Sequence, residues 1–144
     1  MSENASVRYC VMIVTNTGTL QGELDLWNEA PQNDEMVQIT LTAGERVFSA
    51  QSEDGFFFAL QNVRKQLDAH NIAIACTGSC LNVYPSPMTA RMDNGEMAYR
   101  LPLERPAQKP DLVNIFEPCK IDEISSVSEQ DNFYVHWLES LRKS

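Results

Sequence analysis

The spacing of the apolar residues changes near residue 55, from every second position to every third or fourth. In residues 20–27 leucines alternate with polar residues, which is the pattern of a strand with one face in solvent. Between residues 56 and 67 the apolar positions recur at steps of four, three and four, as in an amphipathic helix. These positions are Phe56, Leu60, Val63 and Leu67. The change of period predicts an α+β fold.

Further strands are predicted on both sides of this helix. Residues 6–15 are rich in Val, Ile and Tyr and predict a strand buried on nearly both faces. Residues 36–43 and 46–52 flank a short glycine-containing turn and predict a β-hairpin. Residues 72–76 and 96–104 add two more strands. We therefore expect an antiparallel sheet of about five to six strands, with one long central helix, a short helix and a C-terminal helix packed against it.

The short helix is predicted over residues 87–93. Ser86 can cap its first turn, and Pro87 suits the first helical position. Gly95 suits the left-handed residue that follows a helix. A hairpin that turns on Asn94 and Gly95 is the alternative.

The C-terminal helix is predicted over residues 129–143. Ser128 and Asp131 approximate a capping box at its start. Its apolar side is formed by residues one turn apart, namely Phe133, Trp137 and Leu141. Residues 111–116 fit either a short helix or an extended segment, and Pro118 ends both.

The chain has 144 residues and a net charge of −9, and we expect a single domain over residues 1–144. Residues 1–54 hold nine acidic and two basic residues, which gives this third of the chain a charge of −7. An acidic surface repels phosphate backbones, so we expect no binding to nucleic acid. It attracts a basic protein partner and increases the rate of association.

We expect no membrane association and no cofactor. The longest apolar runs, at residues 11–14 and 56–60, are too short to span a bilayer. The N-terminus lacks the basic and apolar regions of a signal peptide. These features favour a cytoplasmic location.

Acidic and aromatic residues gather in two parts of the sequence. Carboxylates increase association rates, while buried aromatic side chains supply binding energy. The predicted partner-binding residues are Glu23, Asp25, Trp27, Glu29, Asp34 and Glu35. The secondary candidates are Glu117, Asp122, Glu123 and Asp131. A solvated loop face without a partner is the alternative interpretation.

The four cysteines do not match a known metal or catalytic pattern. Cys76 and Cys80 form one loosely spaced pair, and His70 and His136 lie far apart in the sequence. A structural zinc site usually needs two close pairs of ligands, so we expect no metal and no catalytic residue. Cys10 lies in a predicted core strand and is expected to be a small buried apolar residue.

The run NVYPSPM at residues 82–88, followed by Met92, Gly95 and AYRLPL at 98–103, is similar to a run in small uncharacterised bacterial proteins. In size, charge and expected architecture the chain resembles bacterial immunity proteins, including those of contact-dependent growth inhibition systems. The resemblance implies a protein that binds a cognate toxin domain, often a basic nuclease. It would neutralise that domain by steric and electrostatic occlusion.

Two other functions stay open. The loop of residues 76–96, with Arg91 and Arg100, would serve a small enzyme or a ligand-binding domain. A self-associating structural subunit is the third possibility, and the sequence leaves the oligomeric state open.

Overall fold

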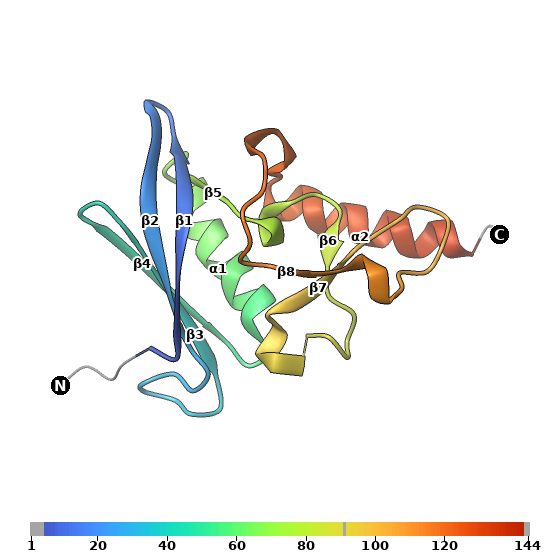
Figure 1. Cartoon of the computed structure of the whole chain (residues 1–144), viewed down its shortest axis with the longest axis horizontal. Helices are drawn as coiled ribbons and strands as arrows, with labels where there is room; N and C mark the ends of the chain where they lie inside the picture. The colour runs from blue at the N-terminus through green and yellow to red at the C-terminus, as the bar shows by residue number, and fades with distance from the viewer. Residues whose placement is uncertain (1–4, 91, 143–144) are drawn as a thin grey trace.

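The computed structural model of the protein describes residues 5–90 and 92–142. These residues form an α+β fold with eight strands in two antiparallel sheets and two α-helices. Helix α1 (Phe56–Asp68) lies between the two sheets (Figure 1). The α+β class is therefore confirmed. The prediction of one sheet is wrong, because the later strands form a sheet of their own.

The larger sheet has the strand order β4-β3-β2-β1-β5. Its strands are β1 (Val7–Thr15), β2 (Gly18–Trp27), β3 (Val37–Ala43), β4 (Arg46–Ser52) and β5 (Ala73–Ala75). The predicted hairpin is confirmed, and Gly44 in its turn has a φ of 64°. The prediction that the first strand is buried on both faces is wrong. Val11 and Ile13 face the core. Cys10, which precedes Val11 in the strand, is exposed.

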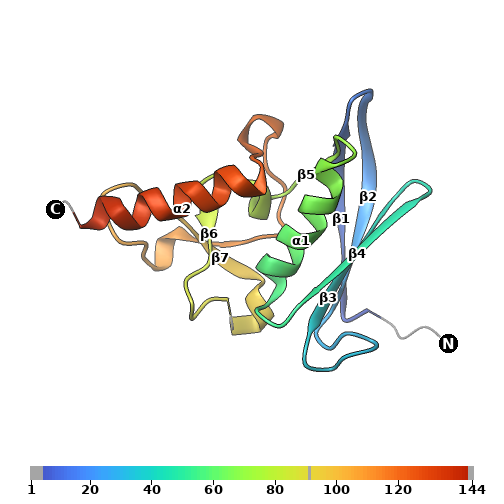
Figure 2. The same cartoon turned by 180° about the vertical axis from the view of Figure 1, so that it is seen from behind.

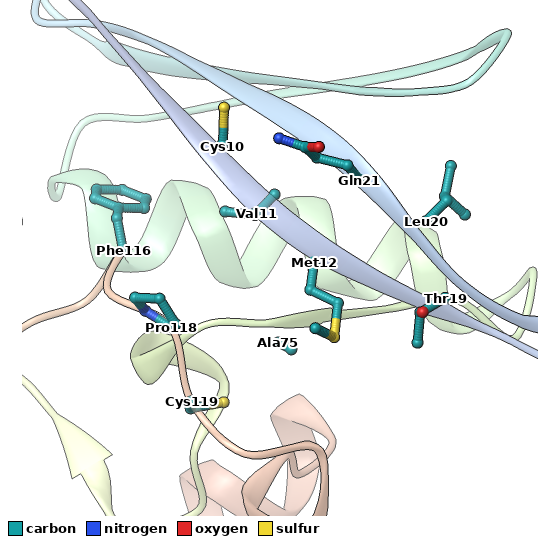
Figure 3. A pocket seen from close by; sticks show the side chains of 10 residues that line it. All are labelled: Cys10, Val11, Met12, Thr19, Leu20, Gln21, Ala75, Phe116, Pro118 and Cys119. Atoms are coloured by element: carbon teal, nitrogen blue, oxygen red, sulfur yellow. The ribbon is translucent and has the colours of Figure 1, made fainter.

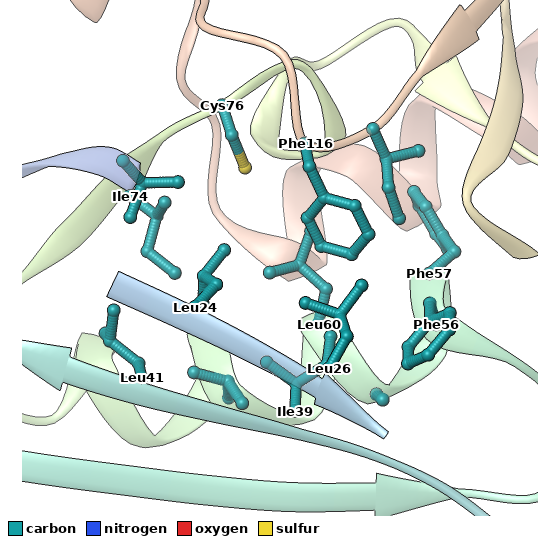
Figure 4. Close-up of a cluster of buried hydrophobic side chains, with 14 of the residues drawn as sticks. Leu24, Leu26, Ile39, Leu41, Phe56, Phe57, Leu60, Ile74, Cys76 and Phe116 are labelled. Carbon is teal, nitrogen blue, oxygen red and sulfur yellow. The ribbon is translucent and has the colours of Figure 1, made fainter. Parts of the chain in front are cut away.

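Helix α1 supplies one side of the hydrophobic core. The residues that defined its period, Phe56, Leu60, Val63 and Leu67, all have no exposed surface. Opposite them the sheet contributes side chains that are equally buried, among them Leu24, Leu26 and Ile39 (Figure 4). Burial of large apolar side chains from both elements stabilises the helix on the sheet by about 1.5–3 kcal/mol for each side chain.

The smaller sheet has the order β6-β7-β8 and lies on the other side of α1. Its strands are β6 (Val83–Tyr84), β7 (Met97–Arg100) and β8 (Leu112–Asn114). The strand expected over residues 96–104 is thus only four residues long. The ambiguous segment that begins at residue 111 is extended, after a short 3₁₀ turn at Lys109–Asp111.

The predicted short helix over residues 87–93 is wrong. Ser86 does cap a turn, because its Oγ accepts a hydrogen bond from Thr89 N at 3.1 Å and Thr89 Oγ1 accepts one from Ser86 N at 2.7 Å. Only one turn forms, and a 3₁₀ helix at Met92–Gly95 follows. Asn94 and Gly95 both have positive φ and cannot continue an α-helix. The connection returns to β7, which pairs with β6, so the hairpin alternative is nearer to the structure.

Helix α2 (Val127–Leu141) begins two residues earlier than predicted. Its capping residue is Ser126 rather than Ser128. Ser126 Oγ accepts from Glu129 N at 3.0 Å, and Glu129 Oε1 accepts from Ser126 N at 2.9 Å. Helix α2 lies beside the smaller sheet, with α1 between it and the larger sheet (Figure 2). The prediction that it packs against the main sheet is therefore wrong.

We predict that Ser126→Ala lowers the free energy of unfolding by about 1 kcal/mol, whereas Ser128→Ala leaves it unchanged. Only Ser126 satisfies an N–H group of the first turn. Urea unfolding of the two variants measures the difference. The Ser126 hydrogen bonds lower the pKa of Glu129. The stabilisation that the ionised Glu129 carboxylate provides by accepting from Ser126 N is therefore present above the ordinary pKa of glutamate and is lost as the pH falls through the lowered value. Equal stability of the two variants would contradict the assignment of the cap.

Candidate partner-binding surface

The structure divides the six predicted partner-binding residues into two groups. Helices α1 and α2 leave one face of the larger sheet uncovered (Figure 1). The alternation of burial along β2 places the first group on that face. Strand β2 directs Glu23 and Asp25 to this face because they alternate with buried leucines. Trp27 follows in the same row and is half-buried. Sequence periodicity therefore placed Glu23 and Asp25 correctly on one face.

Arg8 of the neighbouring strand compensates the two carboxylates. Arg8 Nε lies 2.6 Å from Asp25 Oδ1 and 3.4 Å from Glu23 Oε2. The hydrogen bond to Asp25 and its negative charge raise the pKa of Arg8. This part of the surface is thus an ion-paired row with little excess charge.

The second group lines a polar cavity of about 750 Å³, which we call the acidic cavity. Five exposed carboxylates surround it. They are Glu29, Asp34, Glu35, Glu53 and Asp54. Three of the five were predicted, and the last two were missed. The cavity collects most of the negative charge of the N-terminal third of the chain.

The register of the β3–β4 hairpin builds this cavity. Val37 pairs with Ser52, so the residues before β3 lie beside the residues after β4. The loop before β3 is folded on itself, since Ala30 N donates to Met36 O at 2.8 Å and Glu35 N donates to Asn33 Oδ1 at 3.0 Å. The cavity is therefore a defined structure and not a loose acidic loop.

The carboxylates of the acidic cavity have no cationic partner among the residues that the structure describes. The ion pairs among the described residues join Arg8, Arg100 and Arg105 to carboxylates that do not line the cavity. A concave surface lined by one sign of charge concentrates its electric field and attracts ions of the opposite sign. The cavity is chemically suited to receive lysine or arginine side chains.

Two of the four secondary candidates make hydrogen bonds within the fold. Asp131 is half-buried and accepts hydrogen bonds from Gln61 Nε2 and from Tyr84 OH, both at 2.9 Å. Burial and the bond to Asp131 raise the pKa of Tyr84. Glu123 Oε1 accepts from Lys120 N at 3.1 Å and caps a 3₁₀ turn. Asp131 and Glu123 thus have structural roles, while Glu117 and Asp122 are exposed.

Three of the cysteines lie near one another, which the sequence did not predict. Cys76 and Cys80 are buried, and burial raises the pKa of Cys76. A hydrogen bond between the thiols of Cys80 and Cys119 lowers the pKa of Cys80 and raises that of Cys119. All four cysteines are free, and Cys10 is exposed instead of buried as predicted. In the described ranges no group of three or more His, Cys, Asp or Glu side chains is arranged to hold a metal.

An apolar pocket of about 520 Å³ opens between β1 and residues 116–119 (Figure 3). Cys10 and Met12 of β1 form one wall, and Phe116 and Pro118 form the other. The sequence pattern does not predict this pocket, because the residues of its two walls are about one hundred positions apart in the sequence.

The use of residues 76–96 by a small enzyme or a ligand-binding domain stays a prediction. Arg100 Nη1 lies 3.5 Å from Asn82 Oδ1 and 3.9 Å from Glu123 Oε2. Its guanidinium is therefore paired with a neighbouring carboxylate. Arg91, the other cation of that hypothesis, lies outside the described residues. Gly78 and Ser79 of this loop are buried and pack against the core.

Comparison with known proteins gives no match to a family model and none to a curated protein. Among the described residues, no helix combines the length and the apolar character that crossing a membrane requires.

Proposed function

We propose that this chain is an immunity protein that binds a basic toxin domain and neutralises it in the cytoplasm. The observation that carries the proposal is the acidic cavity, where five carboxylates without a described cationic partner surround about 750 Å³. The resemblance in size, charge and architecture supports the same class of function. The mechanism is occlusion: the immunity protein covers the substrate surface of the toxin domain.

The acidic cavity accounts for both rate and specificity in this proposal. Its field steers a basic surface toward it, and this effect raises association rates by about 10–1,000-fold at low salt. The ion-paired face with Glu23, Asp25 and Trp27 is contiguous in sequence with the cavity loop. Trp27 is the aromatic side chain of this region that would contribute binding energy.

We predict that neutralising the acidic cavity slows association with the toxin domain by about tenfold or more at low salt. The variant carries Glu29→Gln, Asp34→Asn, Glu35→Gln and Glu53→Gln. The probes are purified bacterial nuclease toxin domains, including any that the neighbouring gene encodes, and stopped-flow fluorescence measures the rate at several salt concentrations. The wild-type rate falls steeply with salt, and the variant rate is nearly flat.

The matched control removes the same number of carboxylates elsewhere. It carries Glu45→Gln, Asp68→Asn, Glu104→Gln and Glu139→Gln, all at exposed residues that belong to neither proposed binding site. This control is expected to keep most of the wild-type rate. If both variants slow association equally, only the net charge matters and the cavity has no special role. If the cavity variant and the control variant both associate at the wild-type rate, the proposed site is wrong.

A further inference from the structure

The larger sheet has two edges, and one of them is only partly covered. Strand β5 lies beside β1 but pairs with it only from Met12 to Val14. Residues 7–11 of β1 therefore pair with β2 on one side and with no described strand on the other. An edge of this kind presents backbone groups to which an extended chain can bind.

The hairpin register shows which residues present those groups. Thr15 and Gly18 flank a two-residue loop and form a hydrogen-bonded pair, and such pairs alternate along antiparallel strands. The odd-numbered residues of β1 therefore bond to β2. Arg8 and Cys10 direct their backbone N–H and C=O groups to the open edge. The side chain of Cys10 is exposed at the same place.

The opposite edge of the sheet, at β4, is blocked. By the same rule Ser49 and Gln51 direct their backbone groups outward. Gln66 Nε2 of helix α1 donates to Ser49 O at 2.9 Å, and Asn62 Nδ2 donates to Gln51 O at 3.2 Å. These bonds occupy the acceptors that a docking strand would need, so β4 is protected against strand addition.

The surroundings of the β1 edge determine which side chains an added strand would carry. The apolar pocket lies on the outer face beside Cys10 and Met12, and its volume of about 520 Å³ accommodates one large apolar side chain. On the other face Tyr9 OH donates to Glu96 Oε1 at 2.9 Å. The charges of Glu96 and Glu117 both act on Tyr9, so two carboxylates lie near the edge there.

We propose that residues 7–11 of β1 bind an extended segment of the protein partner as an added strand. Consecutive side chains of a strand point to opposite faces, so an apolar residue in the pocket is followed by a residue on the other face. That residue is lysine or arginine, which complements Glu96 and Glu117. The identity of the partner rests on the proposed function. The backbone groups and the pocket at the β1 edge do not depend on it.

The test uses a displayed library of random peptides, selected on the full chain. The selected peptides are expected to carry an apolar residue next to a basic one. By amide hydrogen exchange, they are expected to protect the N–H groups of Arg8 and Cys10. Cys10→Pro removes one outward N–H without touching the β1–β2 ladder and is expected to weaken binding about tenfold. Cys10→Ser keeps the N–H and is expected to bind as the wild type.

Two further variants make the result independent of folding effects. Val47→Pro makes the same change at the blocked β4 edge and is expected to leave peptide binding unchanged. Met12→Glu changes an exposed side chain that lines the pocket, and it is expected to abolish selection of the apolar residue. Protection at β4, or equal binding by Cys10→Pro and the wild type, would overturn the proposal. So would protection of Arg8 and Cys10 by dimerisation of the chain itself.

The same variants separate this inference from the proposed function. If Cys10→Pro binds a toxin domain as well as the wild type does, while the cavity variant does not, strand addition is wrong and the proposed function stands. If no toxin domain binds but the selected peptides protect Arg8 and Cys10, the proposed function is wrong. The edge would then remain a peptide-binding site for another partner.

Discussion

Gln130→Leu is expected to lower the free energy of unfolding by about 3 kcal/mol or more, since it removes hydrogen bonds from several buried groups at once. Gln130 is fully buried in α2. Its Nε2 lies 2.9 Å from Gly78 O, 2.8 Å from Cys80 O and 3.0 Å from Val83 O. Leucine fills a similar volume but donates nothing. The carbonyl groups of a loop far away in sequence would be left without this donor.

The same substitution affects a buried charge. Arg64 of α1 is 4% exposed, and its Nη1 donates to Gln130 Oε1 at 2.6 Å. Its Nη2 donates to Ser125 O at 2.7 Å. Burial lowers the pKa of Arg64. None of the ion pairs among the described residues involves Arg64. Neutral oxygens therefore hold this guanidinium, and the loss of one is costly.

Urea unfolding of Gln130→Leu and Asn132→Leu provides the comparison. Asn132 is exposed on the same helix, so its substitution is expected to change stability by at most about 0.5 kcal/mol. Similar stability of the two variants would show that the buried hydrogen-bond network contributes little. In that case the apolar contacts alone would hold α2 against α1.

Gln130 also shows where interpretation of the sequence fails. The apolar period of α2 predicted Phe133, Trp137 and Leu141 as its buried side, but these residues are only half-buried. Polar Gln130 is the residue that enters the core. Its position depends on carbonyl groups of the loop at 78–83, and no local pattern in the helix contains that information.

Elements joined by short turns were the most predictable. The β3–β4 hairpin and helix α1 follow from local periodicity and turn residues, and both are confirmed. The strands of the smaller sheet have only two to four residues, too few to show a period. The start of α2 was ambiguous for another reason. Ser126–Glu129 and Ser128–Asp131 have the same spacing, and the structure uses the pair that buries Val127.

Part of the candidate site was also within reach of the sequence. Two-residue loops fix hairpin register, so the predicted turn at Gly44 already implied that residues 34–36 lie beside 53–55. Glu53 and Asp54 could have been added to the predicted acidic group on that basis. The apolar pocket could not have been predicted from the sequence, because residues 116–119 reach β1 through tertiary packing alone.

Gly55→Ala is expected to lower the free energy of unfolding by about 3 kcal/mol and to disturb the acidic cavity as well. Gly55 precedes α1 with φ 107° and ψ 177°, a region that is almost exclusive to glycine and costs other residues about 1–3 kcal/mol. A Cβ atom there would overlap the carbonyl oxygen of Ala90 and lie 2.9 Å from Asn94 O. Both contacts are to backbone, which cannot move as a side chain does, so overpacking adds about 1–3 kcal/mol.

Gly44→Ala separates the conformational cost from the steric one. Gly44 has a φ of 64°, but the nearest atom to a Cβ there is Leu20 Cδ1 at 4.0 Å. We expect this variant to lose only about 1 kcal/mol, the penalty of a left-handed residue. Gly55, Ala90 and Asn94 line the acidic cavity, so Gly55→Ala should also weaken binding of the toxin domain, whereas Gly44→Ala should not. Equal losses of stability and unchanged binding in both variants would show that the segment at 90–94 adapts freely, and the cavity wall would then not be a fixed part of the binding surface.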